Sequence, residues 1–280
     1  MSFKRTFTTL AAATLLSAAP AFADGIATGK KGLTYHDVFG SNIASILQEH
    51  GVTLPVLQTK GSIDNLNRVA RGEAQVGFTQ ADALMYWRSK NTTLQNNIEI
   101  LGSLGKECAF VAVPEKGAVG DEDDLGKSGI KIAVGAVTSG SAASWKYMTQ
   151  LEDDYSSASV YNKGGLRALA GLTTGHYDAF MWVTAEGNME NKYLQAVMKK
   201  GSGLKLISLD DYDLNDKLPS GEPVYEFRDV KIAKGFFSDK KIEAPCTDVL
   251  VIGNHAADDT ILEAVAEAVL VNKNRVMGNN

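Results

Sequence analysis

The sequence predicts an α/β protein of two lobes, in which each lobe is a mixed sheet flanked by helices and two hinge strands join the lobes. Three observations support this prediction. About 257 residues remain after an N-terminal leader, which is long for one hydrophobic core and comfortable for two. Short apolar strands alternate with amphipathic helices, a pattern typical of α/β sheets. This arrangement then occurs a second time along the chain.

The first 23 residues have the composition of a cleavable signal peptide. Lys4 and Arg5 precede an apolar stretch from Leu10 to Ala19, and Ala21-Phe22-Ala23 forms a small-x-small cleavage site. The apolar stretch is shorter than the roughly 20 residues that a membrane-spanning helix needs. We therefore expect a periplasmic protein that is cleaved after Ala23 and carries no lipid, because no cysteine follows the cut.

Charge and cysteine content restrict the partners. The formal net charge of −5 becomes −7 after cleavage, and acidic and basic residues are mixed along the chain, which argues against nucleic acid as a partner. Cys108 and Cys246 are the only cysteines. An exported protein has the redox setting to pair them, but the sequence leaves open whether their Cα atoms lie within about 7 Å.

The first half of the mature chain is expected to contain three strands and two helices. Phe39, Ile43, Ile46 and Leu47 recur at helical spacing, which predicts a helix from Thr34 to His50 with one buried face. A second helix is marked by three apolar residues, Ile63, Leu66 and Ala70. The expected strands are Gly25 to Thr28, Val52 to Gln58 and Gln75 to Thr79.

The second half repeats this plan. Ile26-Ala27-Thr28-Gly29 has a counterpart in Ile132-Ala133-Val134-Gly135, and Lys60-Gly61-Ser62-Ile63 has one in Lys163-Gly164-Gly165-Leu166. Each segment leads into a loop or helix of similar composition. Two lobes of one plan are the simplest explanation, although short βα units also resemble each other by chance.

Two apolar strands are expected to cross between the lobes, Glu107 to Pro114 and Cys246 to Gly253. They would place residues 24–106 plus 246–280 in lobe 1 and residues 107–245 in lobe 2, and a helix from Asp258 to Val276 would close lobe 1. The alternative is that both are ordinary strands of one large domain.

Two charged regions carry weaker signals. Residues 211–245, dense in charge and interrupted by prolines, are expected to form loops with short strands. The acidic run from Asp121 to Asp124 lacks the ligand spacing of a calcium loop, so we interpret it as a solvated turn.

Four helices are expected to begin directly after strand and loop segments, near Thr34, near Ser62, at Ser139 to Ser141 and near Gly164. Helix N-termini present free N–H groups and a positive dipole end, and in such sheets these loops collect at one edge. The sequence therefore predicts a site for carboxylates or phosphates. The competing interpretation is that each hydroxyl only caps its own helix.

Other residues on these loops extend the candidate site. Lys30, Lys31, Lys60 and Lys163 have the charge to neutralise an anion, although isolated lysines are commonly solvated. Gln80 and Asp82 follow a strand, where Gln80 is suited to hydrogen-bond a ligand and Asp82 to accept an amine or to cap a helix. Tyr35 and Trp182 would supply apolar walls or, equally, core packing.

Signals for catalysis are weak, so we expect no enzyme, no cofactor and no metal site. The four histidines show neither metal-ligand spacing nor a paired cysteine, and common nucleotide-binding and hydrolase motifs are absent from the sequence. An exported hydrolase acting through Ser139 or Ser238 remains the enzyme alternative.

Several motifs together resemble one known family. Ile26 to Tyr35, Thr59 to Leu66 and Gly77 to Asp82 resemble the N-terminal signature of the TAXI family of TRAP-transporter solute-binding proteins. Asp124 to Lys127, together with Ile132 to Gly135 and Ser139 to Ser141, resembles that family's entry into the second lobe. The likeness covers nearly the whole mature chain.

The resemblance implies a type II periplasmic-binding-protein fold that closes on a small anionic organic solute, such as glutamate or a 2-oxo dicarboxylate. The partner would be an integral-membrane TRAP permease, and we expect a monomer. A ligand-sensing subunit of a signalling receptor is the alternative. The implied ligand shell comprises Thr34, Tyr35, Ser62, Asn65, Gln80, Asp82, Ser139, Gly140 and Ser141, with Trp182 as a wall.

The sequence departs from the family pattern in its lysines. Lys30 and Lys31 stand where the family has small residues, and Lys60, which we include in the ligand shell, replaces a glycine. Extra positive charge favours a more anionic or larger ligand, unless these lysines point into solvent.

Overall fold

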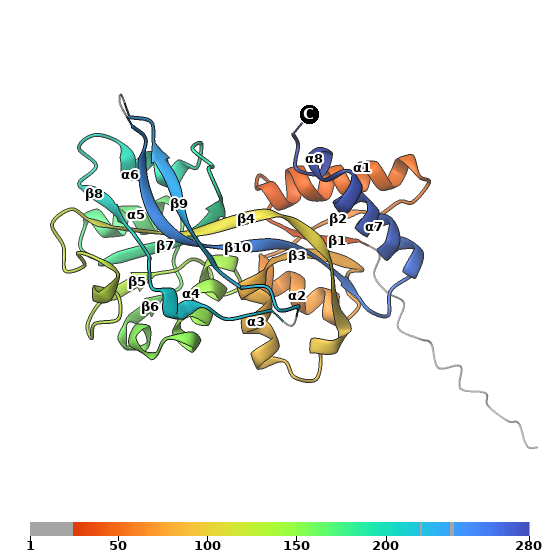
Figure 1. The fold of residues 1–280 in the computed structure, drawn as a ribbon, viewed down its shortest axis with the longest axis horizontal. Coiled ribbons are helices and arrows are strands. Elements are labelled where there is room, and N and C mark those ends of the chain that lie inside the picture. Colours follow the sequence, from red (N-terminus) through yellow and green to blue (C-terminus); the bar gives the residue numbers. More distant parts are fainter. Residues whose placement is uncertain (1–24, 219, 236–237, 280) are drawn as a thin grey trace, which may run out of the picture.

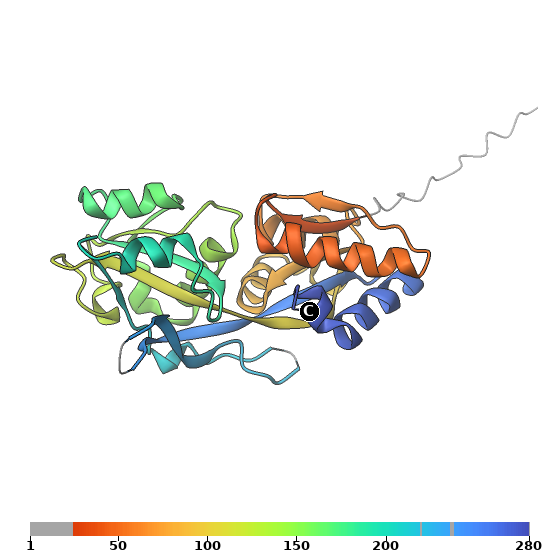
Figure 2. The ribbon, with the colours of Figure 1, turned by 90° about the horizontal axis from the view of Figure 1, so that it is seen from above.

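The computed structural model describes residues 25–218, 220–235 and 238–279, so the expected signal peptide lies outside the described residues. Figure 1 shows two halves side by side, and Figure 2 shows the same two halves from above. Two long strands run through both halves, β4 (Ile98–Pro114) and β10 (Lys240–Asn254). No helix of the described chain is long and apolar enough to cross a membrane.

Lobe 1 contains the N-terminal elements and the C-terminal helices. Its short strands are β1 (Ile26–Gly29), β2 (Val56–Gln58) and β3 (Val76–Gln80). The strands β1 and β3 are buried along their whole length because helices cover both faces of the sheet. These helices are α1 (Ser41–Glu49), α2 (Ser62–Ala70), α3 (Ala81–Lys90), α7 (Asp259–Val271) and α8 (Lys273–Val276).

Lobe 2 is built from the middle of the chain. Its helices are α4 (Gly140–Leu151), α5 (Leu166–Thr173) and α6 (Lys192–Met198). Its strands are β5 (Lys131–Ala133), β6 (Ser159–Tyr161), β7 (Ala179–Ala185), β8 (Leu204–Ile207) and β9 (Glu226–Ala233).

The two lobes repeat one strand order, which confirms the predicted repeat. The main path of the sheet runs β2-β1-β3-β10-β4-β7-β5-β6, so each lobe has its first strand between two parallel neighbours. An antiparallel crossing strand follows in each, β10 beside β3 and β4 beside β7. The sheet is therefore mixed, as expected for the fold class, and is continuous from one lobe to the other.

The crossing strands pair with each other between the lobes. They run antiparallel from the pair of Asn254 and Ile98 to the pair of Cys246 and Cys108, with register shifts near Val249 and Val251. Bulges of this kind bend and twist a strand pair, in agreement with the curvature of β4 and β10 in Figure 1. Both segments predicted as hinge strands lie within these longer strands.

A disulfide joins the crossing strands directly. Cys108 and Cys246 face each other across the β4–β10 ladder, with Cα atoms 3.9 Å apart, and both side chains are fully buried. The bond closes a chain segment with a sequence separation of 138 residues. It therefore ties together the two ends of nearly all of lobe 2, which settles the question that the sequence left open.

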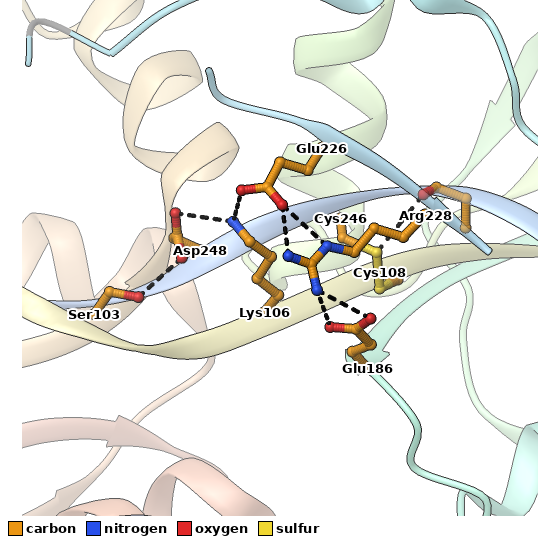
Figure 3. Close-up of polar contacts among 9 residues, drawn as sticks. Ser103, Lys106, Cys108, Glu186, Glu226, Arg228, Cys246 and Asp248 are labelled. Atoms are coloured by element: carbon orange, nitrogen blue, oxygen red, sulfur yellow. Dashed lines mark hydrogen bonds and ion pairs between the residues drawn. A yellow bond between two sulfur atoms is a disulfide. The ribbon is translucent and has the colours of Figure 1, made fainter. Parts of the chain in front are cut away.

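An ion-pair network lies beside the disulfide, as Figure 3 shows. The Nζ atom of Lys106 lies 2.8 Å from Glu226 and 3.3 Å from Asp248, so it links β4 with β9 and β10. Arg228 on β9 contacts Glu226 and also Glu186, which follows β7. Hydrogen bonds from Lys106 and Arg228 hold the pKa of Glu226 below its usual value. The network therefore joins β4, β9, β10 and the end of β7 by ion pairs next to the crossing.

The hydrophobic core has three parts. One cluster, around Phe39, Leu47 and Val265, lies under α1 and α7 in lobe 1. A second, around Phe110 and Trp182, lies under α5 and α6 in lobe 2. The third cluster includes residues of both lobes, because α3 and α4 pack against each other. The lobes therefore share one apolar contact in this structure.

Several expected elements differ from the structure. The helix predicted from Thr34 begins as a π-helical turn, Tyr35–Gly40, and β2 is shorter than expected because residues 52–55 are not extended into the sheet. Asn272 divides the predicted closing helix into α7 and α8. The expectation for residues 211–245 was partly wrong, since β9 is a full strand paired with β10.

The acidic run was also more structured than expected. Its middle forms a 3₁₀ turn, Glu122–Asp124, and the carboxylate of Glu122 accepts backbone N–H bonds from Asp210 and Asp211. The run therefore fixes a neighbouring loop rather than being only solvated.

We expect the double variant Cys108→Ala with Cys246→Ala to lower the free energy of unfolding by about 2–5 kcal/mol, because the unfolded chain gains the freedom of a long open loop. Guanidinium unfolding of the oxidised protein and the variant measures the difference. An unchanged midpoint would show that the disulfide contributes nothing to stability.

Replacing Lys106 with Met should destabilise the fold by about 1 kcal/mol, because two carboxylates at the crossing lose their shared cation while partial exposure limits the cost. Lys241→Met is the matched control, since its pair with Asp229 is long at 3.8 Å and exposed. Equal unfolding midpoints for the two variants would contradict a role for the network.

Candidate functional site

A cleft of about 1040 Å³ lies between the two lobes. Its walls are the loops that follow β1, β2 and β3 in lobe 1 and β5, β6 and β7 in lobe 2. These are the carboxyl ends of the parallel strands, where ligands normally bind in open α/β sheets. The repeated strand order thus brings two equivalent sets of loops to face each other.

The helix N-termini predicted to form the site line this cleft. The residues at these four starts include Tyr35, Ser62, Gly140 and Gly165. Only one of the predicted hydroxyl caps is a cap in the structure, since Ser139 accepts a hydrogen bond from the backbone of Ala142. The other helix starts keep N–H groups free of side-chain caps.

The two walls of the cleft touch near Thr138 and Gly140. The backbone N–H of Ile63 in lobe 1 donates to the carbonyl of Thr138 in lobe 2, at 3.3 Å. Gly61 has a φ of +124°, and a Cβ there would lie 2.9 Å from the same carbonyl. A Cβ at Gly140 would overlap the side-chain amide of Gln80. Glycine at these two positions therefore permits the close approach of the lobes.

A hydrogen-bonded chain of side chains crosses the cleft from lobe 1 to β4. Ser62 Oγ donates to Gln80 Oε1 at 2.6 Å, and Gln80 Nε2 donates to Glu107 Oε2 at 2.9 Å. The hydroxyl of Tyr35 donates to the same carboxylate oxygen at 3.0 Å. These hydrogen bonds therefore hold four cleft-lining residues in one arrangement.

Glu107 is a partly buried carboxylate at the crossing of the lobes. Desolvation raises the pKa of Glu107 to about 7, which outweighs the hydrogen bonds from Tyr35 and Gln80 that favour the charged form. The nearby charge of Asp82 also disfavours ionisation.

Aromatic rings form the wall of the cleft in lobe 2. Trp182 stacks on Phe110 and Phe180, with ring centroids 5.6 and 5.3 Å away, and meets the ring of Tyr193 edge on. Its side chain is only 3% exposed, and its indole N–H has no hydrogen-bond partner among the described residues. Trp182 therefore supplies an apolar, aromatic part of the cleft wall.

The charge of the cleft is mostly positive. Glu107 and Glu190 are its carboxylates. Its basic residues come from both lobes and are Lys30, Lys60, Lys163, Arg167 and Lys192. A ligand in the cleft is therefore surrounded by more cations than anions, which favours negative charge on the ligand.

Nine of the residues predicted for the site line the cleft, and two do not. Those in the cleft are Thr34, Tyr35, Lys60, Ser62, Gln80, Ser139, Gly140, Ser141 and Trp182. Asn65 lies behind the wall, where its amide donates to the carbonyls of Thr28 and Phe78 and so ties β1 to β3. Its place is structural, and it is fully buried.

Asp82 also lies outside the cleft lining. It is 1% exposed and accepts a hydrogen bond from the hydroxyl of Tyr225, at 3.0 Å. Burial raises the pKa of Asp82 to about 6. Tyr225 directly precedes β9, and Asp82 lies in the first turn of α3. The hydrogen bond between them therefore links the start of β9 to the start of α3. The carboxylate of Asp82 does not reach the cleft, so it is not placed to accept an amine there.

Sequence reasoning missed Glu107 and Arg167 as cleft residues. Glu107 was read only as the first residue of a hinge strand, yet a lone carboxylate at the start of an apolar strand is a usable signal. Arg167 directly follows the repeat of the Lys60 segment, and the sequence analysis did not single it out.

The serine considered for hydrolysis at the cleft forms local hydrogen bonds. The hydroxyl of Ser139 donates to the carbonyl of Ala136 and caps α4, so it is engaged locally. Among the described residues, no group of three or more His, Cys, Asp or Glu side chains is placed to hold a metal ion.

Solved structures with the same architecture confirm the two-lobed periplasmic-binding-protein fold. XAC2383 from Xanthomonas citri, solved with ATP, matches with a TM-score of 0.58 at 10% identity, over 92% of this chain and 89% of that chain. The substrate-binding protein of an amino acid ABC transporter matches with a TM-score of 0.51 at 12% identity, over 91% of this chain and 94% of that chain. The GluR0 ligand-binding core in complex with L-glutamate matches with a TM-score of 0.53 at 9% identity, over 93% of this chain and 96% of that chain.

Sequence comparison identifies the family. No curated protein sequence matches the chain. The profile of the NMT1-like family matches residues 26–272, which is most of the sequence and includes every cleft residue named above. The chain belongs to the NMT1-like family.

Proposed function

We propose that this protein is an exported, non-catalytic solute-binding protein that captures a small carboxylate-bearing organic solute in the cleft between its lobes. The observation that carries the proposal is the convergence of four helix starts and five basic side chains on one cleft. Both features stabilise negative charge on a ligand. The stacked rings of Trp182 and Phe180 add an apolar surface on the wall of lobe 2.

The solved relatives support this proposal through their ligands. One is the binding protein of an amino acid transporter, and another was solved with L-glutamate. Glutamate and 2-oxo dicarboxylates are therefore reasonable first ligands. The resemblance to the TAXI family adds a TRAP-type secondary transporter as the proposed recipient of the solute.

Binding would involve movement of the lobes about the crossing of β4 and β10. We propose lobe 1 as residues 24–106 plus 246–280 and lobe 2 as residues 107–245. In this proposal, the close approach of Ile63 to Thr138 and of Gln80 to Gly140 would characterise the closed form. A solute that contacts both walls stabilises this form over the open one, and only that difference in affinity drives closure.

A thermal-shift screen of the purified mature protein tests the function. Dicarboxylates, amino acids and aromatic acids are the probes. A ligand that binds only the folded protein raises its stability by about 2.7 kcal/mol at a hundredfold excess over its dissociation constant. The absence of a shift with every acid would refute the proposed function. Delivery to a permease is tested in cells. Solute uptake should be lost when the gene for this protein is deleted and also when the gene for the candidate permease is deleted.

Removal of cleft cations should weaken binding of the acid that gives the largest shift. We expect Lys60→Met and Lys163→Met each to raise its dissociation constant by about tenfold, which corresponds to roughly 1.4 kcal/mol. Lys146→Met is the matched control, because that ammonium group lies over the ring of Tyr86 on α3. Titration calorimetry of the three variants measures the effect, and equal constants for all three would contradict it.

A further inference from the structure

Glu107 is one of two carboxyl groups in a cleft that otherwise attracts anions. It lies opposite Thr247 of β10 on one side and Ala185 of β7 on the other, so it is placed where the two lobes meet. The proposed function does not use this carboxylate. A charge that repels the proposed solute at this position therefore requires its own explanation.

Among the described residues, only one oxygen of the Glu107 carboxylate has a hydrogen-bond partner. Tyr35 and Gln80 both donate to Oε2, whereas Oε1 accepts no hydrogen bond from any residue that the structure describes. Five basic residues line the same cleft, but none of the ion pairs among the described residues involves Glu107.

The two donors on Oε2 favour the carboxylate form and leave Oε1 as an acceptor. An unpaired, partly desolvated carboxylate oxygen is stabilised most by a cationic donor. The other carboxylate considered for this role, Asp82, is bonded to Tyr225 outside the cleft. Glu107 is thus the acidic group in reach of a bound solute at the crossing.

We propose that the solute is an amino-acid-like zwitterion, whose ammonium group binds Oε1 of Glu107 while its carboxylate is held by the helix N-termini and basic side chains. This inference rests on the proposed function and names the class of solute for the same cleft. It assigns Glu107 the role of selecting an amine over a ketone at the carbon beside the carboxylate.

The test compares amino acids with the 2-oxo acids that differ from them only at that carbon. The pairs are L-glutamate with 2-oxoglutarate, L-leucine with 4-methyl-2-oxopentanoate, and L-phenylalanine with phenylpyruvate, each titrated by calorimetry. We expect the amino member of at least one pair to bind about tenfold tighter or better. Glu107→Gln should abolish this preference, and Glu99→Gln, on the same strand but outside the cleft lining, should retain it.

The pH dependence provides a measurement that needs no variant. With a pKa of about 7 in the empty cleft, Glu107 is mostly ionised at pH 8 and mostly protonated at pH 6. Because the ammonium group needs the ionised form, affinity for the amino acid should fall about tenfold from pH 8 to pH 6. Affinity for the 2-oxo acid should not fall in this way.

The outcomes separate this inference from the proposed function. Equal or tighter binding of the 2-oxo members would overturn the inference and leave a carboxylate-binding protein in place. Tighter binding of a 2-oxo acid at pH 6 would show instead that protonated Glu107 donates to an anion. Binding only of acids outside the pairs would also overturn it. If no acid binds the folded protein, both proposals fail.

Discussion

The antiparallel pairing of β4 with β10 is the interaction on which the rest of the structure depends. These two strands carry the chain between the lobes, and each also completes the sheet of one lobe, β10 beside β3 and β4 beside β7. Any shift of their register would displace both lobes at once. The buried disulfide between Cys108 and Cys246 and the ion pairs of Lys106 hold the register at the crossing.

The cleft follows from this arrangement. Because the two crossing strands are antiparallel, the repeated βα units of the two lobes present their strand ends toward each other. Helix starts, glycines and basic residues that are far apart in the sequence thereby face one space. Gly61 and Gly140 allow the walls to touch, and a larger side chain at either position would collide with the opposite lobe.

The polar residues near the cleft divide into two functional groups. Asn65 and Asp82 are buried behind the wall, where their hydrogen bonds hold β1, β3, α3 and the segment before β9 in place. Tyr35, Ser62, Gln80 and Glu107 form the connected chain that lines the cleft. The first group holds the elements that carry the second, so the geometry at Glu107 depends on residues behind the cleft wall.

The sequence by itself determined the class of fold, the repeat of βα units and the helix starts that meet at the cleft. Apolar periodicity and glycine-bearing loops are local signals, and they survive in any tertiary context. Nine of the eleven residues predicted for the site indeed line the cleft. Strand ends were less well predicted, as for β2 and β9, because strand length depends on the neighbours with which a strand pairs.

Only the tertiary structure decided which polar groups line the cleft. Asp82 and Glu107 both stand next to apolar strands, and no local pattern tells which one is covered. Tyr225, which is 143 residues away from Asp82 in sequence, covers one, and the crossing of β4 with β10 opens the other to the cleft. The pairing of the cysteines was undecided for the same reason, since contacts between distant segments depend on the register of the crossing strands rather than on local sequence.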